Sequence, residues 1–229
     1  VSAIIILYYP DSDKLERLYQ SVINQVSSVI FVDNSPTDLS RQKNKTWVDS
    51  LDSDNCYYLP MDGNLGIATA QNIGIEFAKT LNIDFVLLLD QDSALPNNMV
   101  ENLISAHQRL EQMGKKVAAV APIFLDEKTK EMANLIRHKG LRVQKVKPNT
   151  SFDYEQSDYV IASGSLIKIT TLHEVGLMRD DFFIDWVDIE WGLRAKQKGY
   201  FSYVVPKVVM NHSIGDESVE FGNKNREAS

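Results

Sequence analysis

Two aspartates spaced one residue apart follow an apolar run in the middle of the chain. Residues 85–89 are apolar throughout, and Asp90-Gln91-Asp92 comes directly after them. In a β-strand alternate side chains share a face, so Asp90 and Asp92 can converge on one divalent cation. A polar turn that ends a buried strand would show the same residues. The spacing alone leaves a metal site and a turn as equal alternatives.

A second group of acids lies near the carboxyl-terminal end of the chain, among aromatic residues. A carboxylate in apolar surroundings can be tuned toward general-base chemistry, and aromatic rings suit a sugar ring. The structural alternative is a helix start, with Asp185 as the N-cap and Asp188 near the third helical position. Glu190 and Arg194 are spaced to form a helix-surface ion pair. The surrounding rings are those of Phe182, Phe183, Trp186 and Trp191.

Two further polar groups follow apolar runs. His212 comes after residues 201–210, and Asp33-Asn34-Ser35 comes after residues 28–32. A lone histidine is usually structural, but with two carboxylates it is a plausible third ligand for a divalent ion. The residue types of Asp33-Asn34-Ser35 favour a turn, although the same residues at the ligand edge of a sheet can hydrogen-bond a nucleoside. The sequence leaves open whether His212 is a metal ligand or a structural residue, and whether Asp33-Asn34-Ser35 binds a nucleoside or forms a turn.

The elements that must position these residues alternate between apolar strands and helices, which is typical of a parallel sheet. The acids then lie at the carboxyl ends of strands, where open α/β sheets bind ligands. A charged stretch at 126–157 is expected to be an insertion or flap with a hairpin near Val143. Strands are expected at 3–9, 28–32, 56–59, 85–89, 117–125, 159–169 and 201–210. Helices are expected at 11–26, 47–51, 63–74, 96–113, 170–175 and 185–198.

Two stretches contain glycines at positions where backbone can approach a neighbour closely. One enters a helix through Asn64 and Gly66 and continues to Asn72, and its small residues let that helix lie near other backbone or a ligand. The other is Ser163-Gly164, which interrupts the apolar run 159–169.

Composition narrows the class of protein. The chain has 229 residues and a net charge of -7, which argues against nucleic-acid binding because that needs a cationic surface. Cys56 is the only cysteine, so no intrachain disulfide or cysteine zinc cluster can form, and a reducing cytoplasm fits. The glycine signatures of dinucleotide-binding and P-loop proteins do not occur. We expect the sequence to be a piece of a longer protein that continues beyond Ser229.

In their order along nearly the whole chain, these motifs resemble the inverting family 2 glycosyltransferases with the GT-A fold, and within them the bacterial rhamnosyltransferases. The resemblance implies an α/β fold: a Rossmann-like, mostly parallel central sheet flanked by helices, with a small additional sheet or hairpin. It implies one domain over 1–229, with a nucleotide-sugar-binding half at about 1–125 and an acceptor-binding half at about 126–229. The motifs are Val32-Asp33-Asn34-Ser35, Asn64-Leu65-Gly66, Asn72-Ile73-Gly74, Asp90-Gln91-Asp92-Ser93, Ser163-Gly164, residues 183–195 and His212.

The resemblance also implies roles for individual residues. Asp92 would ligate Mg²⁺ or Mn²⁺ on the donor diphosphate, Asp90 would contact the ribose or the metal, and His212 matches a metal-ligand position. Asp188 would be the general base. The Glu of the family's usual Glu-Asp pair is Val187 here, so Asp185 and Glu190 compete for that role. Substrate contacts are expected from Tyr8, Asp33 (to the nucleobase), Asn34, Asn64, Gly66, Asn72, Asp90, Ser163, Gly164, Asp185, Trp186 and Trp191.

The activity implied by the resemblance is metal-dependent transfer of L-rhamnose from dTDP-L-rhamnose, with inversion, to a hydroxyl of a cell-surface polysaccharide or lipid-linked glycan. The acceptor is expected to lie across Trp186 and Trp191. We expect a cytoplasmic protein, peripheral at the inner face of the cell membrane. The alternatives are a family 2 transferase that uses a hexose or N-acetylhexosamine donor, and a non-catalytic module that binds nucleotide sugars or glycans.

Overall fold

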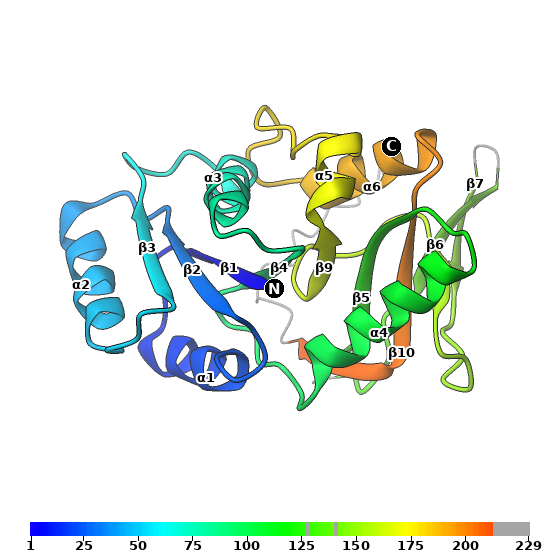
Figure 1. Cartoon of the computed structure of the whole chain (residues 1–229), viewed down its shortest axis with the longest axis horizontal. Helices are drawn as coiled ribbons and strands as arrows, with labels where there is room; N and C mark the ends of the chain where they lie inside the picture. The colour runs from blue at the N-terminus through cyan, green and yellow to red at the C-terminus, as the bar shows by residue number, and fades with distance from the viewer. Residues whose placement is uncertain (127–128, 140–141, 213–229) are drawn as a thin grey trace, which may run out of the picture.

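The computed structural model describes residues 1–126, 129–139 and 142–212, and an eight-stranded sheet runs through it (Figure 1). Its strands are β1 (Ser2–Leu7), β2 (Ser28–Asp33), β3 (Cys56–Pro60), β4 (Phe85–Asp90), β5 (Val117–Asp126), β8 (Glu155–Ser157), β9 (Ser165–Lys168) and β10 (Phe201–His212). They lie in the order β3-β2-β1-β4-β9-β5-β10-β8. The first four are parallel to one another, and β5 is parallel to β10. β9 runs antiparallel between β4 and β5, so it joins the two parallel parts.

Helices cover both faces of this sheet, so its central strands are buried on both sides and are apolar along their length. Figure 1 shows α3, α5 and α6 on one side of the sheet and α1 and α4 on the other. Val48 places α2 in the same core as α1 and α4. Within the described residues, no helix combines the length and apolar character needed to cross a membrane. The helices are α1 (Ser12–Val22), α2 (Asp38–Asp49), α3 (Ile67–Thr80), α4 (Met99–Gln112), α5 (Ile169–Val175) and α6 (Val187–Gln197).

The hairpin expected in the charged stretch is present as a separate two-stranded sheet of β6 (Leu135–Lys139) and β7 (Arg142–Val146). Asp158 fastens it to the body of the protein. The Asp158 carboxylate accepts hydrogen bonds from the His138 N–H and ring, and it pairs with Lys196 on α6 at 2.7 Å. The hairpin therefore connects to the helix that carries Asp188.

The mixed α/β fold with a mostly parallel sheet is confirmed, but two element predictions were wrong. The helix expected at 47–51 begins much earlier, because Thr37 caps it by accepting a hydrogen bond from the Ser40 N–H. Its buried residues are Asn44 and Val48, so it lacks the regular apolar spacing that would have shown it. The strand expected at 159–169 is confined to β9, because Gly164 turns the chain with a φ of 79°.

Gly74 brings α3 close to the sheet, as the small residues of this helix predicted. A Cβ atom at this position would lie 2.4 Å from Cγ2 of Ile4 on β1. The close approach places the amino end of α3 beside the carboxyl ends of β1 and β2, where the cleft described next is found.

Candidate functional site

A cleft of about 440 Å³ opens at the carboxyl ends of β1, β2 and β4. Parallel strands of an open α/β sheet bind their ligands at this edge. The predicted residues that meet in the cleft are Tyr8, Asn34, Asn64, Gly66, Asp90 and Asp92. Gln91, Phe183 and Ile184 also line it, although they were not predicted as binding residues.

Gln91 joins the acid pair to the end of β1. Its Oε1 accepts a hydrogen bond from the Tyr8 N–H at 2.7 Å, and its Nε2 donates to the Tyr8 carbonyl at 2.9 Å. The side chain thereby continues the pairing of β1 with β4 beyond the last paired backbone residues. Gln91 is a positioning residue for the acids on either side of it. The partner is 83 residues away in the chain, so no local pattern indicates this role.

Replacing Gln91 with alanine should weaken donor binding. Two hydrogen bonds hold the loop and contribute about 2 kcal/mol together, so we expect the donor KM to rise by up to about thirtyfold with a smaller change in kcat. Steady-state kinetics with varied donor would measure both. Gln20→Ala is the matched control, since Gln20 makes a side-chain bond to Glu16 on the exposed surface of α1. An unchanged donor KM for Gln91→Ala would contradict the positioning role.

The acid pair suits a divalent cation shared with a diphosphate. Asp92 is 41% exposed at its side chain and lies 3.9 Å from Lys14. Over the described ranges, no three His, Cys, Asp or Glu residues form a metal-binding group. Mg²⁺ is commonly held by one or two carboxylates together with substrate phosphates, so two carboxylates at the rim of a nucleotide-sized cleft fit such an ion.

Asp33 does not reach the cleft, in contrast to its expected contact with a nucleobase. Its carboxylate is fully buried, and Oδ1 accepts the Ser35 N–H at 2.9 Å. Oδ2 accepts bonds from Asn44 Nδ2 at 2.8 Å and the Tyr58 hydroxyl at 2.7 Å. The pKa of the Tyr58 hydroxyl is raised, mainly by burial and in addition by its hydrogen bond to Asp33. Asp33 thus ties β2 to α2 and β3, and the neighbouring Asn34 is the residue at the cleft.

Asn34 also shapes the loop that precedes α3. Its Nδ2 donates to Oδ1 of Asn64 at 2.9 Å. On the other side of this loop, the Phe183 carbonyl accepts the Ile67 N–H at 2.7 Å. Gly66 has a φ of 88°, and a Cβ there would lie 2.5 Å from the same carbonyl oxygen. The glycine is therefore required for the close approach of residue 183 to the wall of the cleft.

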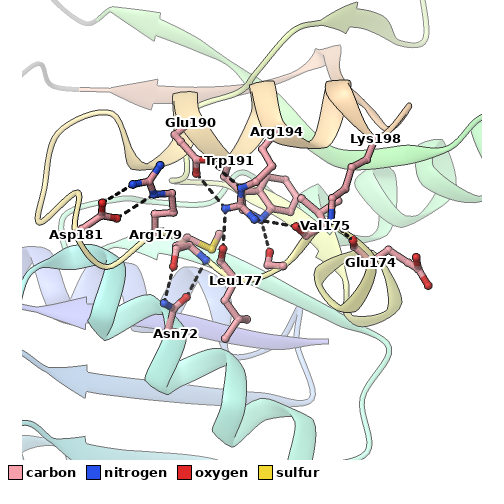
Figure 2. A network of polar contacts seen from close by, with 12 residues as sticks. Asn72, Glu174, Val175, Leu177, Arg179, Asp181, Glu190, Trp191, Arg194 and Lys198 are labelled. Carbon is pink, nitrogen blue, oxygen red and sulfur yellow. Dashed lines mark hydrogen bonds and ion pairs between the residues drawn. The ribbon is translucent and has the colours of Figure 1, made fainter.

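Two other predicted contact residues have packing roles and do not line the cleft. Asn72 exchanges two hydrogen bonds with the backbone of Met178, at 2.8 and 3.0 Å, and points toward the segment before α6 (Figure 2). The Gly164 N–H donates to the Leu88 carbonyl at 2.7 Å, and a Cβ on Gly164 would lie 2.9 Å from Cγ of Pro122. The predicted ligand contacts of Asn72 and Gly164 stay predictions, and neither residue is among those that line the cleft.

Asp188 lies in the first turn of α6 and is partly buried. Its Oδ1 accepts the Ile189 N–H at 2.8 Å, and its Oδ2 accepts the Ala162 N–H at 3.3 Å. Burial raises the pKa of the Asp188 carboxyl, and these two N–H groups act in the opposite direction. A carboxylate with a raised pKa is a stronger base, which is the property that general-base catalysis needs.

The start of α6 differs from the prediction. Trp186, not Asp185, is the N-cap; it has a left-handed φ of 68° and makes no side-chain capping bond. Asp185 and Trp186 are both exposed, and Trp186 has 64% of its surface accessible. Trp186 is thus accessible to an acceptor, whereas Trp191 is 3% exposed and its indole N–H donates to the Gly176 carbonyl at 2.8 Å.

A polar network anchors α6 against the end of α5 (Figure 2). Arg194 donates to the carbonyls of Val175 and Leu177 at 2.8 and 2.7 Å. It also forms the predicted pair with Glu190, at 2.8 and 3.0 Å. Because both Glu190 oxygens face Arg194, this residue is a poor competitor for the role of base. The network fixes the helix that presents Asp188.

Gly192 is a positioning residue that the sequence reasoning missed. It lies one helical turn after Asp188, and a Cβ there would lie 2.5 Å from Cβ of Tyr159. Glycine therefore lets α6 approach the segment before β9. A glycine inside a helix, four residues after a candidate acid, was the available signal, since glycine is unfavourable at such a position unless packing requires it.

Ala162 and Ser163 connect the two acidic groups of the site. The Ala162 N–H bonds the Asp188 carboxylate, and Ser163 Oγ accepts the Asp90 N–H at 3.1 Å. Ser163 is buried and also bonds the Ser93 hydroxyl at 2.8 Å, so in this structure it supports the acid pair, and its predicted substrate contact stays a prediction. The adjacent residues Ala162 and Ser163 thus link the Asp188 carboxylate to the backbone of Asp90 through two hydrogen bonds, although Asp188 does not line the cleft of the acid pair.

The remaining predicted metal ligand, His212, is the last residue of β10 and pairs in register with Asp126. Its side chain lies outside the described part of the structure. Its role as a ligand stays a prediction.

Comparison with known proteins places this geometry in a family. Two solved structures share the fold. GalNAc-T7 with UDP, GalNAc and Mn²⁺ has a TM-score of 0.73 at 15% identity, over 93% of this chain and 43% of that one. The mannosyltransferase PcManGT from Pyrobaculum calidifontis, in complex with GDP-Man and Mn²⁺, has a TM-score of 0.64 at 16% identity, over 95% of this chain and 57% of that one. These likenesses show that the chain has the GT-A fold.

Sequence comparison gives the particular family. The model of glycosyl transferase family 2 matches residues 2–167, so the chain belongs to this family. The dTDP-rhamnosyl transferase RfbF of Shigella flexneri is 30% identical over 223 residues, which is 96% of this chain and 71% of that protein. The low-salt glycan biosynthesis hexosyltransferase Agl10 of Haloferax volcanii is 25% identical over 86% of this chain. The chain spans 62% of the Haloferax protein.

Proposed function

We propose that this glycosyltransferase transfers L-rhamnose from dTDP-L-rhamnose to a hydroxyl of a cell-surface polysaccharide or lipid-linked glycan, with inversion and with a divalent cation. The observation that carries the proposal is the Ala162-Ser163 connection, which links the partly buried Asp188 carboxylate to the strand end that carries the acid pair of a nucleotide-sized cleft. The choice of donor is supported by the likeness to the Shigella protein, whose name states dTDP-rhamnosyl transfer.

Asp90 and Asp92 are the residues that would hold the cation, Mg²⁺ or Mn²⁺, at the donor diphosphate. Two structures with the same fold contain Mn²⁺ together with a nucleotide, which supports this assignment. When bound, the cation neutralises charge on the departing nucleoside diphosphate. The chain itself has a net charge of -7 and offers Lys14 as the basic side chain beside Asp92.

The acceptor would approach Asp188 through a second, mainly apolar recess of about 290 Å³. Asp188 lies in its wall, and β5, β6 and β10 supply apolar residues such as Pro122, Leu135 and Val204. The acceptor was expected to lie across Trp186 and Trp191, but Trp191 is buried, so we assign the acceptor to this recess instead. Apolar walls suit the C–H faces of a sugar, and they also maintain the raised pKa of the base.

The proposed reaction is a single displacement. The Asp188 carboxylate takes the proton of the acceptor hydroxyl while that oxygen bonds to the anomeric carbon of the donor sugar. The bond from this carbon to the diphosphate oxygen breaks, and its electron pair leaves with dTDP. Attack occurs on the face opposite the leaving group, so the configuration at the anomeric carbon inverts.

Transfer assays with a set of nucleotide sugars test the donor. The purified protein would be incubated with lipid-linked acceptors and dTDP-L-rhamnose, UDP-hexoses, UDP-N-acetylhexosamines or GDP-mannose, each with Mn²⁺ and with EDTA. We expect product from dTDP-L-rhamnose and a loss of most activity with EDTA. Faster transfer of a hexose would assign the donor otherwise. Nucleotide-sugar binding with no transfer to any acceptor would favour the non-catalytic alternative.

A further inference from the structure

We propose that one buried water molecule, held by Gln71 and Ser202, positions the Asp188 carboxylate. This inference rests on the proposed role of Asp188 as the general base. Gln71 and Ser202 are then positioning residues, because they act on the reaction through the water and Asp188 and do not touch the substrate.

The space for this water is a small cavity of about 20 Å³. Gln71 on α3, Ser202 on β10 and Asp188 on α6 all line it, with Leu88, Ala119 and Trp191 among its apolar walls. One water needs about 10–15 Å³ by the same kind of measure, so the cavity accommodates one molecule and excludes a larger ligand.

Two polar atoms in this cavity lack partners among the described residues. Gln71 is 3% exposed and Ser202 is 1% exposed, and neither Gln71 Oε1 nor Ser202 Oγ hydrogen-bonds any described group. Leaving such atoms unsatisfied is costly, and buried water is the usual way in which proteins satisfy them. Two residues 131 positions apart therefore direct polar groups into one water-sized space beside the base.

The donors and acceptors around the cavity match one water. It can accept a bond from the Ser202 hydroxyl and donate one bond to Gln71 Oε1 and another to the Asp188 carboxylate. This makes three hydrogen bonds, the number typical of a buried water. Each Asp188 oxygen accepts one N–H and retains a further lone pair. Because Asp188 also lines the acceptor recess, its outer side stays open to the substrate hydroxyl.

The variants Gln71→Met and Ser202→Ala, and their combination, test the role of the water. A bond donated to a carboxylate favours its charged form, so removing the water should raise the pKa of Asp188 further and move the acid limb of kcat/KM to higher pH. For the double variant we expect a fall in kcat of about tenfold and a shift of about one pH unit, with the donor KM unchanged. A purely structural role would lower the melting temperature without moving the pH profile.

Other charges near Asp188 do not obscure this readout. The Tyr159 phenol, from the segment before β9, is a titratable group that interacts with Asp188. Burial raises the pKa of Tyr159, so this phenol does not titrate in the acid limb of the pH profile. Glu190 on the same helix is neutralised by Arg194. The cavity-lining side chains of α3, β9 and β10 are Gln71, Ser165, Ile167 and Ser202, which carry no charge.

Ser28→Ala is the matched control, since it removes the hydroxyl of a buried serine that bonds Ser2 at 2.6 Å in the other half of the sheet. It should lower stability and leave the pH profile unchanged. A high-resolution crystal structure of the unsubstituted protein is the second measurement, and a water bonded to Gln71 Oε1 and Ser202 Oγ should appear in it. An empty cavity, or a double variant with the wild-type acid limb and kcat, would overturn the inference. Loss of transfer in Asp188→Asn would then leave the proposed function standing, whereas full activity of that variant would refute the function itself.

Discussion

Asp188→Asn is expected to abolish sugar transfer, with kcat falling by about 10²- to 10⁴-fold, the usual contribution of a general base. The amide is nearly the same size as the carboxylate but cannot take a proton from the acceptor hydroxyl. Donor binding should be unchanged, because Asp188 does not line the cleft at β1, β2 and β4. Transfer rates and the affinity for dTDP in the presence of Mn²⁺ would be measured on the same preparation.

Two neighbouring acids provide the controls for this variant. Asp185 is exposed three residues earlier, and Glu190 is paired with Arg194. Asp185→Asn should keep a near wild-type rate, which separates Asp188 from its competitor. Glu190→Gln should reduce activity only to the extent that the weakened contact with Arg194 changes the position of α6. If Asp188→Asn retained its rate while Asp185→Asn lost it, the base would be Asp185.

The stability of Asp188→Asn supplies an independent check with a defined sign. Burial raises the pKa of Asp188 in the folded state, so the folded protein binds this proton more tightly than the unfolded chain does. Stability is therefore lost as pH rises from the ordinary aspartate pKa through the raised one. At neutral pH the neutral amide removes that cost, but its one oxygen can accept from only one of the Ile189 and Ala162 N–H groups. We therefore expect the melting temperature of the variant, relative to the wild type, to rise as the pH rises through the raised pKa. Thermal unfolding of both proteins at several pH values would measure this trend.

Asp92→Asn is expected to weaken metal-dependent donor binding by at least about tenfold, equivalent to about 1.4 kcal/mol. The carboxylate is exposed at the rim of the cleft, and an amide is a much weaker ligand for Mg²⁺ or Mn²⁺. The exposed contact with Lys14 contributes little to stability, so the fold should be unaffected. Thermal shift with dTDP, with and without Mn²⁺, would report the affinity, since a ligand stabilises by an amount that depends on its concentration relative to Kd.

Asp54→Asn is the matched control for Asp92, because Asp54 is an exposed acid just before β3, at the amino ends of the strands. It should show the wild-type thermal shift. Equal shifts for Asp92→Asn and the unsubstituted protein in Mn²⁺ would remove Asp92 from the metal site. Loss of the shift in both conditions would indicate instead that Asp92 contacts the nucleotide directly.

Side-chain burial was the property that the sequence predicted least well. Asp33, Asn72 and Trp191 all have types that suit ligand contact, and all three are engaged with other parts of the protein. A residue type shows which bonds a side chain can make, but the choice of partner depends on which elements pack together. For Trp191 that partner is the Gly176 carbonyl at the end of α5, which becomes a neighbour only when α5 and α6 pack.

The sequence by itself determined the alternation of strands and helices, the position of Asp90 and Asp92 at the end of a buried strand, and the family. These features are local, because apolar periodicity and turn chemistry act over a few residues. The tertiary structure alone decided that Gln91 holds the end of β1, and that β9 inserts beside β4 to bring Ala162 and Ser163 between Asp90 and Asp188. These contacts join residues tens of positions apart, and only the order of strands in the sheet specifies them.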